Sequence, residues 1–343
     1  MTQTFMKREI AEIPQVVSRL LTEGRGAITD AANAFREADP RVVVTVARGS
    51  SDHAATYFKY ACELTTGVPV ASVGPSIASI YGAALKLDRA AAIGISQSGG
   101  SPDIIALLES ARRSGATTVA ITNTASSKLA EGANSVVDIL AGTEKSVAAT
   151  KTFVTSAVAG LALVADWSGD EALLAALDTL PTALEQALTT DWSALVDATV
   201  GASSLYVLGR GPGAAIASEA ALKFKETCGL HAEAYSSAEV LHGPAAIVQD
   251  GFPVLALCAG PADKARASVL ETSARLEKQG GKVFVTDPEP GTGIALPVAR
   301  TGHPLTDPIA LAVSFYNFVE TLARARGFNP DEPPHLRKVT ATV

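Results

Sequence analysis

The stretch "AAIGISQSGGSPDIIALLESARR", residues 91–113, decides the fold. Residues 91–96 form an apolar run without polar alternation, which is typical of a strand buried on both faces of a parallel sheet. Pro102 fits the first turn of a helix capped by Ser101, and apolar residues recur at helical spacing over 104–111. The stretch therefore predicts a strand, a glycine-bearing turn and a helix, the repeating unit of an α/β protein.

Four polar side chains lie in this turn: Ser96, Gln97, Ser98 and Ser101. A helix N-terminus offers unpaired N–H groups and the positive end of a dipole, both of which favour a bound anion. Serine is also common in turns and at helix caps. Because one cap accounts for only one of these serines, we interpret the turn as a phosphate-binding site.

The same pattern recurs along the chain. "RVVVTVARGSSDHAATYFKYACE" (41–63) and "SSLYVLGRGPGAAIASEAALKFKE" (203–226) each predict a strand, a glycine-bearing turn and a helix, and further strand–turn stretches follow at similar separations. The sequence thus predicts an α/β fold of two similar lobes, each a mainly parallel sheet flanked by helices. Ligands of such sheets bind at the carboxyl ends of the strands, where "ARGSS" and "SQSGG" fall. Lobe 2 has "CAGP" in place of the serine turn, so we expect phosphate to bind in lobe 1.

The predicted organisation has five parts. The C-terminal part is rich in proline and ends in basic and β-branched residues, which fits either a frayed terminus or a flap over a site. The parts are N-terminal helices (1–40), phosphate-binding lobe 1 (41–170), a helical linker (171–198), lobe 2 with the catalytic Glu and His (199–328) and a tail over the active site (329–343).

Composition narrows the function classes. A net charge of −7 gives no attraction for nucleic acid or an anionic membrane surface. Cys62, Cys228 and Cys258 are widely separated, which argues against a disulfide framework or a zinc site and suits a reducing compartment. The N-terminus has no apolar signal segment, and the longest apolar run is too short to span a bilayer. We therefore expect a soluble, cytoplasmic protein that binds no metal.

A second group of polar residues begins at Glu219. Glu219, Lys223 and Glu226 are three or four residues apart, hence on one helical face, and a solvated salt-bridged face would explain these three alone. His242 precedes Gly-Pro, a signal that ends a helix and leaves the imidazole at its end. A carboxylate, an amine and an imidazole in one short segment are what a proton-transfer site needs. His231, by contrast, is expected to be packed.

A third stretch, "AGTEKSVAATKTF" (141–153), predicts a loop that enters a helix. It carries Glu144, Lys145 and Lys151 among small residues. Residue type alone leaves both a structural and a functional role open for these three.

Taken together and in order, these motifs resemble the SIS (sugar isomerase) domain family. The likeness is greatest to the isomerase half of glucosamine-6-phosphate synthases and to SIS-type glucosamine-6-phosphate deaminases, and it extends over nearly the whole chain. The sequence departs from the family pattern at Arg48, Gly100 and Arg337. The stretches that carry the resemblance are "MKREIAEIP", "ARGSS", "SQSGGSPD", "GTEKSVAATKTF", residues 219–244 and "HLRKVT".

The resemblance implies a role for each matching residue. Glu226 corresponds to the base that moves a proton between C1 and C2, and His242 to the ring-opening acid/base, which in the family comes from a neighbouring subunit. Lys223 corresponds to an active-site lysine and Lys338 to the tail lysine that folds over the sugar. Val147 lines the pocket. The residues implied to hold the phosphate and hydroxyls are Ser50, Ser51, Ser96, Gln97, Ser98 and Ser101.

The resemblance further implies a homodimer with a shared active site, a sugar-phosphate substrate and no cofactor. No stretch with a glutaminase cysteine precedes the first helix in this sequence, and the reverse reaction needs no glutamine. We therefore expect conversion of glucosamine 6-phosphate to fructose 6-phosphate and ammonia. The alternatives are a fructosamine-6-phosphate deglycase or another ketose/aldose phosphate isomerase, and a non-catalytic sugar-phosphate sensor.

Overall fold

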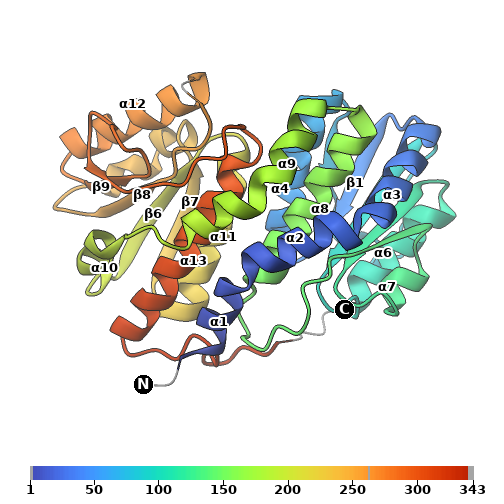
Figure 1. The fold of residues 1–343 in the computed structure, drawn as a ribbon, viewed down its shortest axis with the longest axis horizontal. Helices are drawn as coiled ribbons and strands as arrows, with labels where there is room; N and C mark the ends of the chain where they lie inside the picture. Colours follow the sequence, from blue (N-terminus) through green and yellow to red (C-terminus); the bar gives the residue numbers. More distant parts are fainter. Residues whose placement is uncertain (1–2, 262, 339–343) are drawn as a thin grey trace. The chain divides into compact units, whose positions relative to one another are not determined.

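The computed structural model describes residues 3–261 and 263–338, so the last five residues of the predicted tail lie outside the described residues. The chain divides into two compact units, each built around one of the two predicted sheets (Figure 1). The lobe 1 unit contains residues 15–144 and 151–178 with the tail residues Arg337 and Lys338. The lobe 2 unit contains residues 3–14, 145–150 and 179–336, apart from position 262.

The lobe 1 unit is a five-stranded parallel sheet with helices on both faces. Helix α8 packs against α3 and α4, and α6 packs against β3, α5 and α7 (Figure 1). The expected N-terminal helix pair is α2 and α3. The elements are α2 (Ile13–Glu23), α3 (Arg25–Ala38), β1 (Val42–Val46), α4 (Ser50–Thr66), β2 (Val70–Ser72), α5 (Ser76–Ser79), β3 (Ala90–Ser96), α6 (Pro102–Arg113), β4 (Thr117–Thr122), α7 (Lys128–Glu131), β5 (Ser135–Asp138), α8 (Lys151–Ser168) and the first half of α9 (Glu171–Ala187).

The lobe 2 unit repeats this plan. Helix α11 packs against α13, β6 and β7, and α12 packs against β9. The predicted linker region corresponds to α9 and α10. The elements are α1 (Phe5–Ala11), the second half of α9, α10 (Ser193–Thr199), β6 (Ser204–Gly209), α11 (Pro212–Cys228), β7 (His231–Ser236), the 3₁₀ turns η1 (Glu239–His242) and η2 (Pro244–Ile247), β8 (Pro253–Ala256), α12 (Lys264–Lys278), β9 (Lys282–Val285), β10 (Ile294–Ala295) and α13 (Asp307–Ala325).

The two sheets have the same topology, which confirms the prediction of two similar α/β lobes. The strand order is β2-β1-β3-β4-β5 in lobe 1 and β7-β6-β8-β9-β10, read in the same direction, in lobe 2. Every pairing between neighbouring strands is parallel, with Val42 opposite Ala90 at the start of the β1–β3 pair. Because the strands are parallel, their carboxyl ends meet at one edge of each sheet.

Burial on both faces explains why the strands read as continuous apolar runs. All seven residues of β3 are buried. Val44 and Val46 of β1 join Ile104 and Leu108 of α6 in a core on one face of the sheet. The second sheet has a matching core, in which Leu208 of β6 contributes to a cluster with residues of α12. Burying these side chains supplies the largest favourable term for each lobe.

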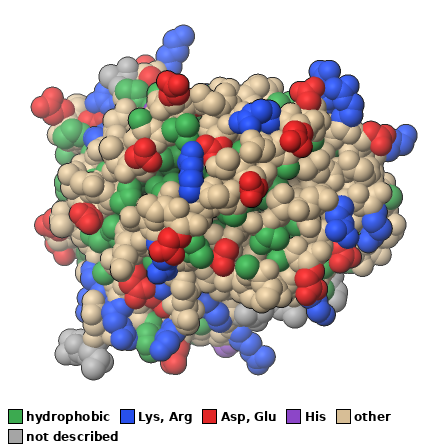
Figure 2. All heavy atoms as spheres, turned by 45° about the vertical axis from the view of Figure 1, so that its right-hand side comes forward, with side chains coloured by type: hydrophobic (Ala, Val, Ile, Leu, Met, Phe, Trp, Pro, Cys, Tyr) green, Lys and Arg blue, Asp and Glu red, His purple; other side chains and the backbone are tan. Residues whose placement is uncertain are grey.

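Two observations describe the helices and the surface of the part of the chain that the structure describes. No described helix is both long and apolar enough to cross a bilayer. On the face drawn in Figure 2, acidic and basic side chains are interspersed. This pattern is unlike the one-sign basic patch that binds nucleic acid.

Candidate active site

The two serine-bearing turns of lobe 1 lie at the same edge of its sheet, because β1 and β3 are neighbouring parallel strands. Ser50 and Ser51 open α4 directly after the turn that follows β1. Ser96 is the last residue of β3, and Ser101 is the N-cap residue of α6. Figure 1 labels β1, α4 and α6, which flank these two turns. The fold therefore brings "ARGSS" and "SQSGGS" together, as the sequence predicts.

Hydrogen bonds inside the second turn give it a defined shape. The Ser96 hydroxyl oxygen accepts from the backbone N–H of Gly99 at 3.2 Å, and the Ser98 hydroxyl oxygen accepts from that of Gly100 at 3.3 Å. Gly99 has φ +61°, and a Cβ there would lie 2.0 Å from Ser127 Oγ. Only glycine therefore fits at this position.

The start of α6 differs in one detail from the expected cap. Ser101 has extended backbone geometry and Pro102 follows it in the first turn, as predicted, but the Ser101 hydroxyl makes no capping hydrogen bond within the described residues. Asp103 instead accepts from the N–H of Ile104 at 2.9 Å. The Ser101 hydroxyl is not committed to the cap.

Arg48 joins the two turns of lobe 1. Its guanidinium donates to the Asp103 carboxylate through Nε at 3.1 Å and through Nη2 at 3.0 Å, and the Asp103 side chain is fully buried. A carboxylate at this helix start would repel an incoming anion. Arg48 offsets that charge, so its departure from the family pattern fits an anion site. Sequence inspection did not find this pair, because its members are 55 residues apart.

A polar hollow of about 570 Å³ lies at the carboxyl ends of β3, β4 and β5. It is lined by Gln97 from the serine turn, by Asn123 and Thr124 after β4, and by Asp138 and Glu144. The Asn123 amide donates to the Gly142 carbonyl at 2.8 Å, which fixes the loop that leads to Glu144. The hollow therefore adjoins the predicted phosphate site, within lobe 1.

In lobe 2, α11 holds a buried row of three charged side chains. Lys223 Nζ contacts a Glu219 carboxylate oxygen at 3.3 Å and donates a hydrogen bond to Glu226. The Lys223 side chain is fully buried and Glu219 almost so, hence the alternative of a solvated face is wrong. The Tyr316 hydroxyl on α13 donates to Glu219 at 2.9 Å. The sequence carried no signal for Tyr316, which lies 97 residues from its partner.

The protonation of Lys223 follows from these contacts. Burial by itself lowers the pKa of the amine, but the charges and hydrogen bonds of Glu219 and Glu226 outweigh burial and raise the pKa above its usual 10.5. Lys223 is therefore a cation at neutral pH, and its hydrogen bond holds the Glu226 side chain in position.

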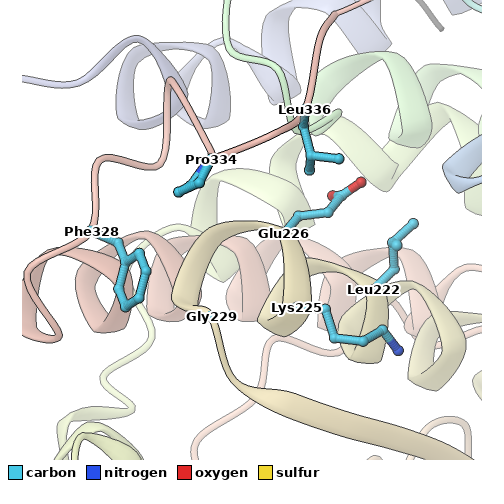
Figure 3. Close-up of a pocket in the computed structure, with 7 residues that line it drawn as sticks. All are labelled: Leu222, Lys225, Glu226, Gly229, Phe328, Pro334 and Leu336. Atoms are coloured by element: carbon cyan, nitrogen blue, oxygen red, sulfur yellow. The ribbon is translucent and has the colours of Figure 1, made fainter.

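Glu226 is the member of this row that reaches solvent, with 21% of its side chain exposed. Its carboxylate lies at the wall of a largely apolar hollow of about 410 Å³ inside the lobe 2 unit (Figure 3). In Figure 3 the amine of the neighbouring Lys225 points away from the Glu226 carboxylate. The other lining residues are Leu222, Gly229, Phe328, Pro334 and Leu336.

His231 and His242 of lobe 2 are both exposed. His242 ends the 3₁₀ turn η1 before Gly243, as the Gly-Pro signal predicts, and its ring is accessible. The expectation that His231 is packed is wrong, because His231 is the first residue of the edge strand β7.

The remaining predicted residues lie in the 145–150 loop and the tail. The backbone N–H of Val147 donates to the Asp331 carbonyl at 3.4 Å. Lys338 Nζ donates to the Glu144 carboxylate at 2.7 Å, within the lobe 1 unit. Lobe 1 thus gathers the six phosphate-site residues and Lys338, whereas Lys223, Glu226, His242 and Val147 belong to the lobe 2 unit.

The cysteines offer no reactive thiol. Burial raises the pKa of the Cys62 and Cys228 thiols to about 11 and that of Cys258 to about 12. All three therefore stay protonated at neutral pH.

Among the described residues, no group of three His, Cys, Asp or Glu side chains is placed to hold a metal ion.

Comparisons with known proteins agree with this geometry. The family described as "SIS domain" matches residues 36–165 and 200–323. The glutamine–fructose-6-phosphate aminotransferase (isomerizing) of Symbiobacterium thermophilum is 33% identical over 360 residues, which cover 97% of this chain. The alignment covers 58% of that relative, so this chain spans little more than half of it.

Two solved structures share the fold. A candidate phosphosugar isomerase from Silicibacter pomeroyi DSS-3 superposes with a TM-score of 0.92 and 53% identity, over 96% of this chain and 100% of that one. The C-terminal domain of glucosamine-fructose-6-phosphate aminotransferase from Francisella tularensis gives a TM-score of 0.83 at 24% identity, over 97% of this chain and 99% of that one.

Proposed function

The chain belongs to the SIS-domain family, and from that premise we propose that it is an amino-sugar phosphate isomerase. The reaction we assign is the conversion of glucosamine 6-phosphate to fructose 6-phosphate and ammonia. One observation carries the proposal. Glu226 is held by a fully buried lysine while its carboxylate reaches a hollow, which is the arrangement a general base needs.

Binding is assigned to lobe 1. The hydroxyls of Ser50, Ser51, Ser96, Ser98 and Ser101 and the amide of Gln97 hold the phosphate and sugar hydroxyls at the carboxyl edge of the sheet. Phosphate binding supplies binding energy that can be used to orient the remote carbons of the sugar. Val147 lines the pocket.

The chemistry is a proton transfer between two carbons. His242, from a neighbouring subunit of a homodimer, assists opening of the pyranose ring. Glu226 removes the proton from C2 of the open aldose, which gives an enolamine, and returns a proton to C1. The resulting ketose imine reacts with water to give fructose 6-phosphate and ammonia. Lys338 offsets negative charge that develops on the sugar oxygens.

The burial of Lys223 refines its assigned role. Its amine contacts Glu219 and Glu226 and has no exposed surface. We assign it to holding Glu226 in place, rather than to contact with the sugar. Because the carboxylate is already held in place, less free energy is needed to rearrange it when the proton is transferred.

A second candidate is favoured by the apolar hollow beside Glu226. Its walls of Leu222, Phe328 and Leu336 suit a substrate whose nitrogen carries an apolar substituent, as in a fructosamine 6-phosphate. Such a substrate would release an amine in place of ammonia.

The test is to incubate the purified chain with glucosamine 6-phosphate and to measure ammonia and ketose release. Equal amounts of both products are expected. Glucose 6-phosphate is the control for isomerisation without nitrogen release, and fructosamine 6-phosphates test the second candidate. Binding of these sugars without any turnover would overturn the proposal in favour of a sensor.

A further inference from the structure

We propose that Glu144 is a positioning residue that docks the C-terminal tail by binding the Lys338 amine. Neither the sequence motifs nor the reaction assigned above gives Glu144 a role. The docking itself is independent of the proposed function. The effect of docking on catalysis does rest on the proposed function, because that function assigns Lys338 to the sugar oxygens.

The contacts of Glu144 place it between the tail and the start of α8. Its carboxylate accepts from Lys338 Nζ at 2.7 Å, from the Thr152 hydroxyl at 2.6 Å and from the Thr152 backbone N–H at 3.2 Å. All three residues belong to the lobe 1 unit. The Thr152 N–H lies in the first turn of α8, where the helix dipole favours a negative charge.

Burial makes this carboxylate a strong binding site for a cation. The Glu144 side chain is fully buried, whereas Lys338 is 25% exposed. Thr152 supplies hydrogen bonds to Glu144 but no charge. Removing one partner of a buried ion pair is destabilising, so the tail amine contributes to the stability of this region. The ion pair thereby fixes where the tail lysine lies.

The position of the pair relates it to the candidate substrate site. Glu144 lines the same polar hollow as Gln97 of the serine turn and Asn123. The docked tail lysine is therefore anchored at the wall of the hollow that adjoins the predicted phosphate site. A phosphosugar bound there would meet a lysine whose position is already determined by Glu144.

Limited trypsin digestion of the full chain tests the docking without reference to activity. Glu144→Gln keeps the size of the side chain but removes its charge and replaces one accepting oxygen by a donating amide nitrogen. We expect cleavage after Lys338 to become at least about tenfold faster, because the Lys338 amine must leave Glu144 before it can enter the protease. The matched control is Glu109→Gln, which removes a half-exposed carboxylate paired with Arg113 at 3.5 Å on the surface of α6. An unchanged cleavage rate in Glu144→Gln would overturn the proposal.

Kinetics with the substrate found above distinguish positioning from a general structural role. Glu144→Gln and Lys338→Gln should each lower kcat, and the double variant should lose little more than either single one. Glu144→Asp should recover part of the loss. Independent, additive losses would overturn the positioning role. If the wild-type chain turns over no sugar phosphate while Glu144→Gln still frees the tail, the proposed function fails and the docking stands.

Discussion

Helices α4 and α11 occupy the same place in the two lobes but carry different polar side chains at corresponding positions. Each has 17 residues and follows a glycine with nearly identical backbone angles, φ 56° and ψ −134° at Gly49, φ 56° and ψ −133° at Gly211. When the two helices are aligned from these glycines, Ser50 and Ser51 of α4 stand where α11 has Pro212 and Gly213. The two serines that the proposed phosphate site uses are thus at the start of α4.

Further along the two helices, three charged residues of α11 align with uncharged residues of α4. Glu219, Lys223 and Glu226 of α11 align with Tyr57, Ala61 and Leu64 of α4. Tyr57 and Ala61 are fully buried apolar positions, and Leu64 is 67% exposed. One copy of the helix therefore presents hydroxyls at its N-terminus, and the other presents a buried base and its counter-ion.

The carboxyl edges of the two sheets also differ in their polar groups. At the carboxyl edge of lobe 1, the serine turn adjoins a polar hollow. At the corresponding edge of lobe 2, Asp287 binds Arg266 at 2.6 and 3.0 Å, and Arg300 reaches Asp307 at 3.4 Å. In lobe 2, these ion pairs lie at the edge that corresponds to the hydroxyl-bearing edge of lobe 1. The two lobes thus share a backbone plan but differ in the polar groups at the carboxyl edge, which fits the proposed division between phosphate binding and proton transfer.

The largest expected effect comes from removing the base. Glu226→Gln should bind substrate but lose about 10²–10⁴-fold in kcat, because amide nitrogen and oxygen do not accept the C2 proton. The readout is exchange of the C2 hydrogen with deuterium oxide, followed by NMR. Lys225→Met, which changes the exposed neighbour on the same helix, is the control. Retained exchange in Glu226→Gln would remove this residue from the role.

The second test concerns the buried counter-ion of α11. Lys223→Met leaves the Glu219 and Glu226 carboxylates without their cation, and we expect a loss of about 3–5 kcal/mol in the free energy of unfolding. Lys225→Met should cost well under half of that, since its amine is exposed and donates only to the Ala232 carbonyl. Urea denaturation measures both. Equal losses would mean that the buried row does not depend on its charge balance.

The third test compares turn glycines. Gly49→Ala and Gly211→Ala should cost the same, about 1–2 kcal/mol, because both have φ 56° and open space around the position of a Cβ. Gly99→Ala should cost more and also raise KM, because its Cβ would collide with Ser127 and deform the serine turn. Thermal unfolding and KM measurements check this order. A Gly99→Ala variant as stable as Gly49→Ala would contradict the assigned rigidity of the turn.

The smallest effect is a pH dependence at the lobe 2 edge. Burial alone raises the pKa of Asp287, but hydrogen bonds from Arg266 and Glu289 and the charges of Arg266 and Arg300 bring it below its usual 3.8. The unfolded chain therefore binds this proton more readily, so the stability from Asp287 is present above about pH 3.8 and is lost as pH falls through the lower folded pKa. Asp287→Asn should show a shallower loss of Tm below pH 4 than the wild type. The control is Asp39→Asn, a surface position in lobe 1.

Local patterns were sufficient to predict the lobes. The apolar runs of β1 and β3, the glycine turns after them and the helical spacing that follows depend on residues that are close in the chain. The serine turn was found for the same reason, since its members lie within residues 96–101. The burial of Lys223 could not be predicted, because spacing on one face fits a solvated row as well as a buried one.

The sequence by itself determined the α/β lobes, their internal repeat, the serine-bearing turn and the three charged residues on one face of α11. Only the tertiary structure decided that this face is buried, that Tyr316 binds Glu219, that Arg48 neutralises Asp103 and that Glu144 binds Lys338. The physical reason is that these contacts join residues far apart in the chain. Propensity and periodicity act over a few neighbouring residues, whereas burial and ion pairing depend on which distant segments the sheets bring together.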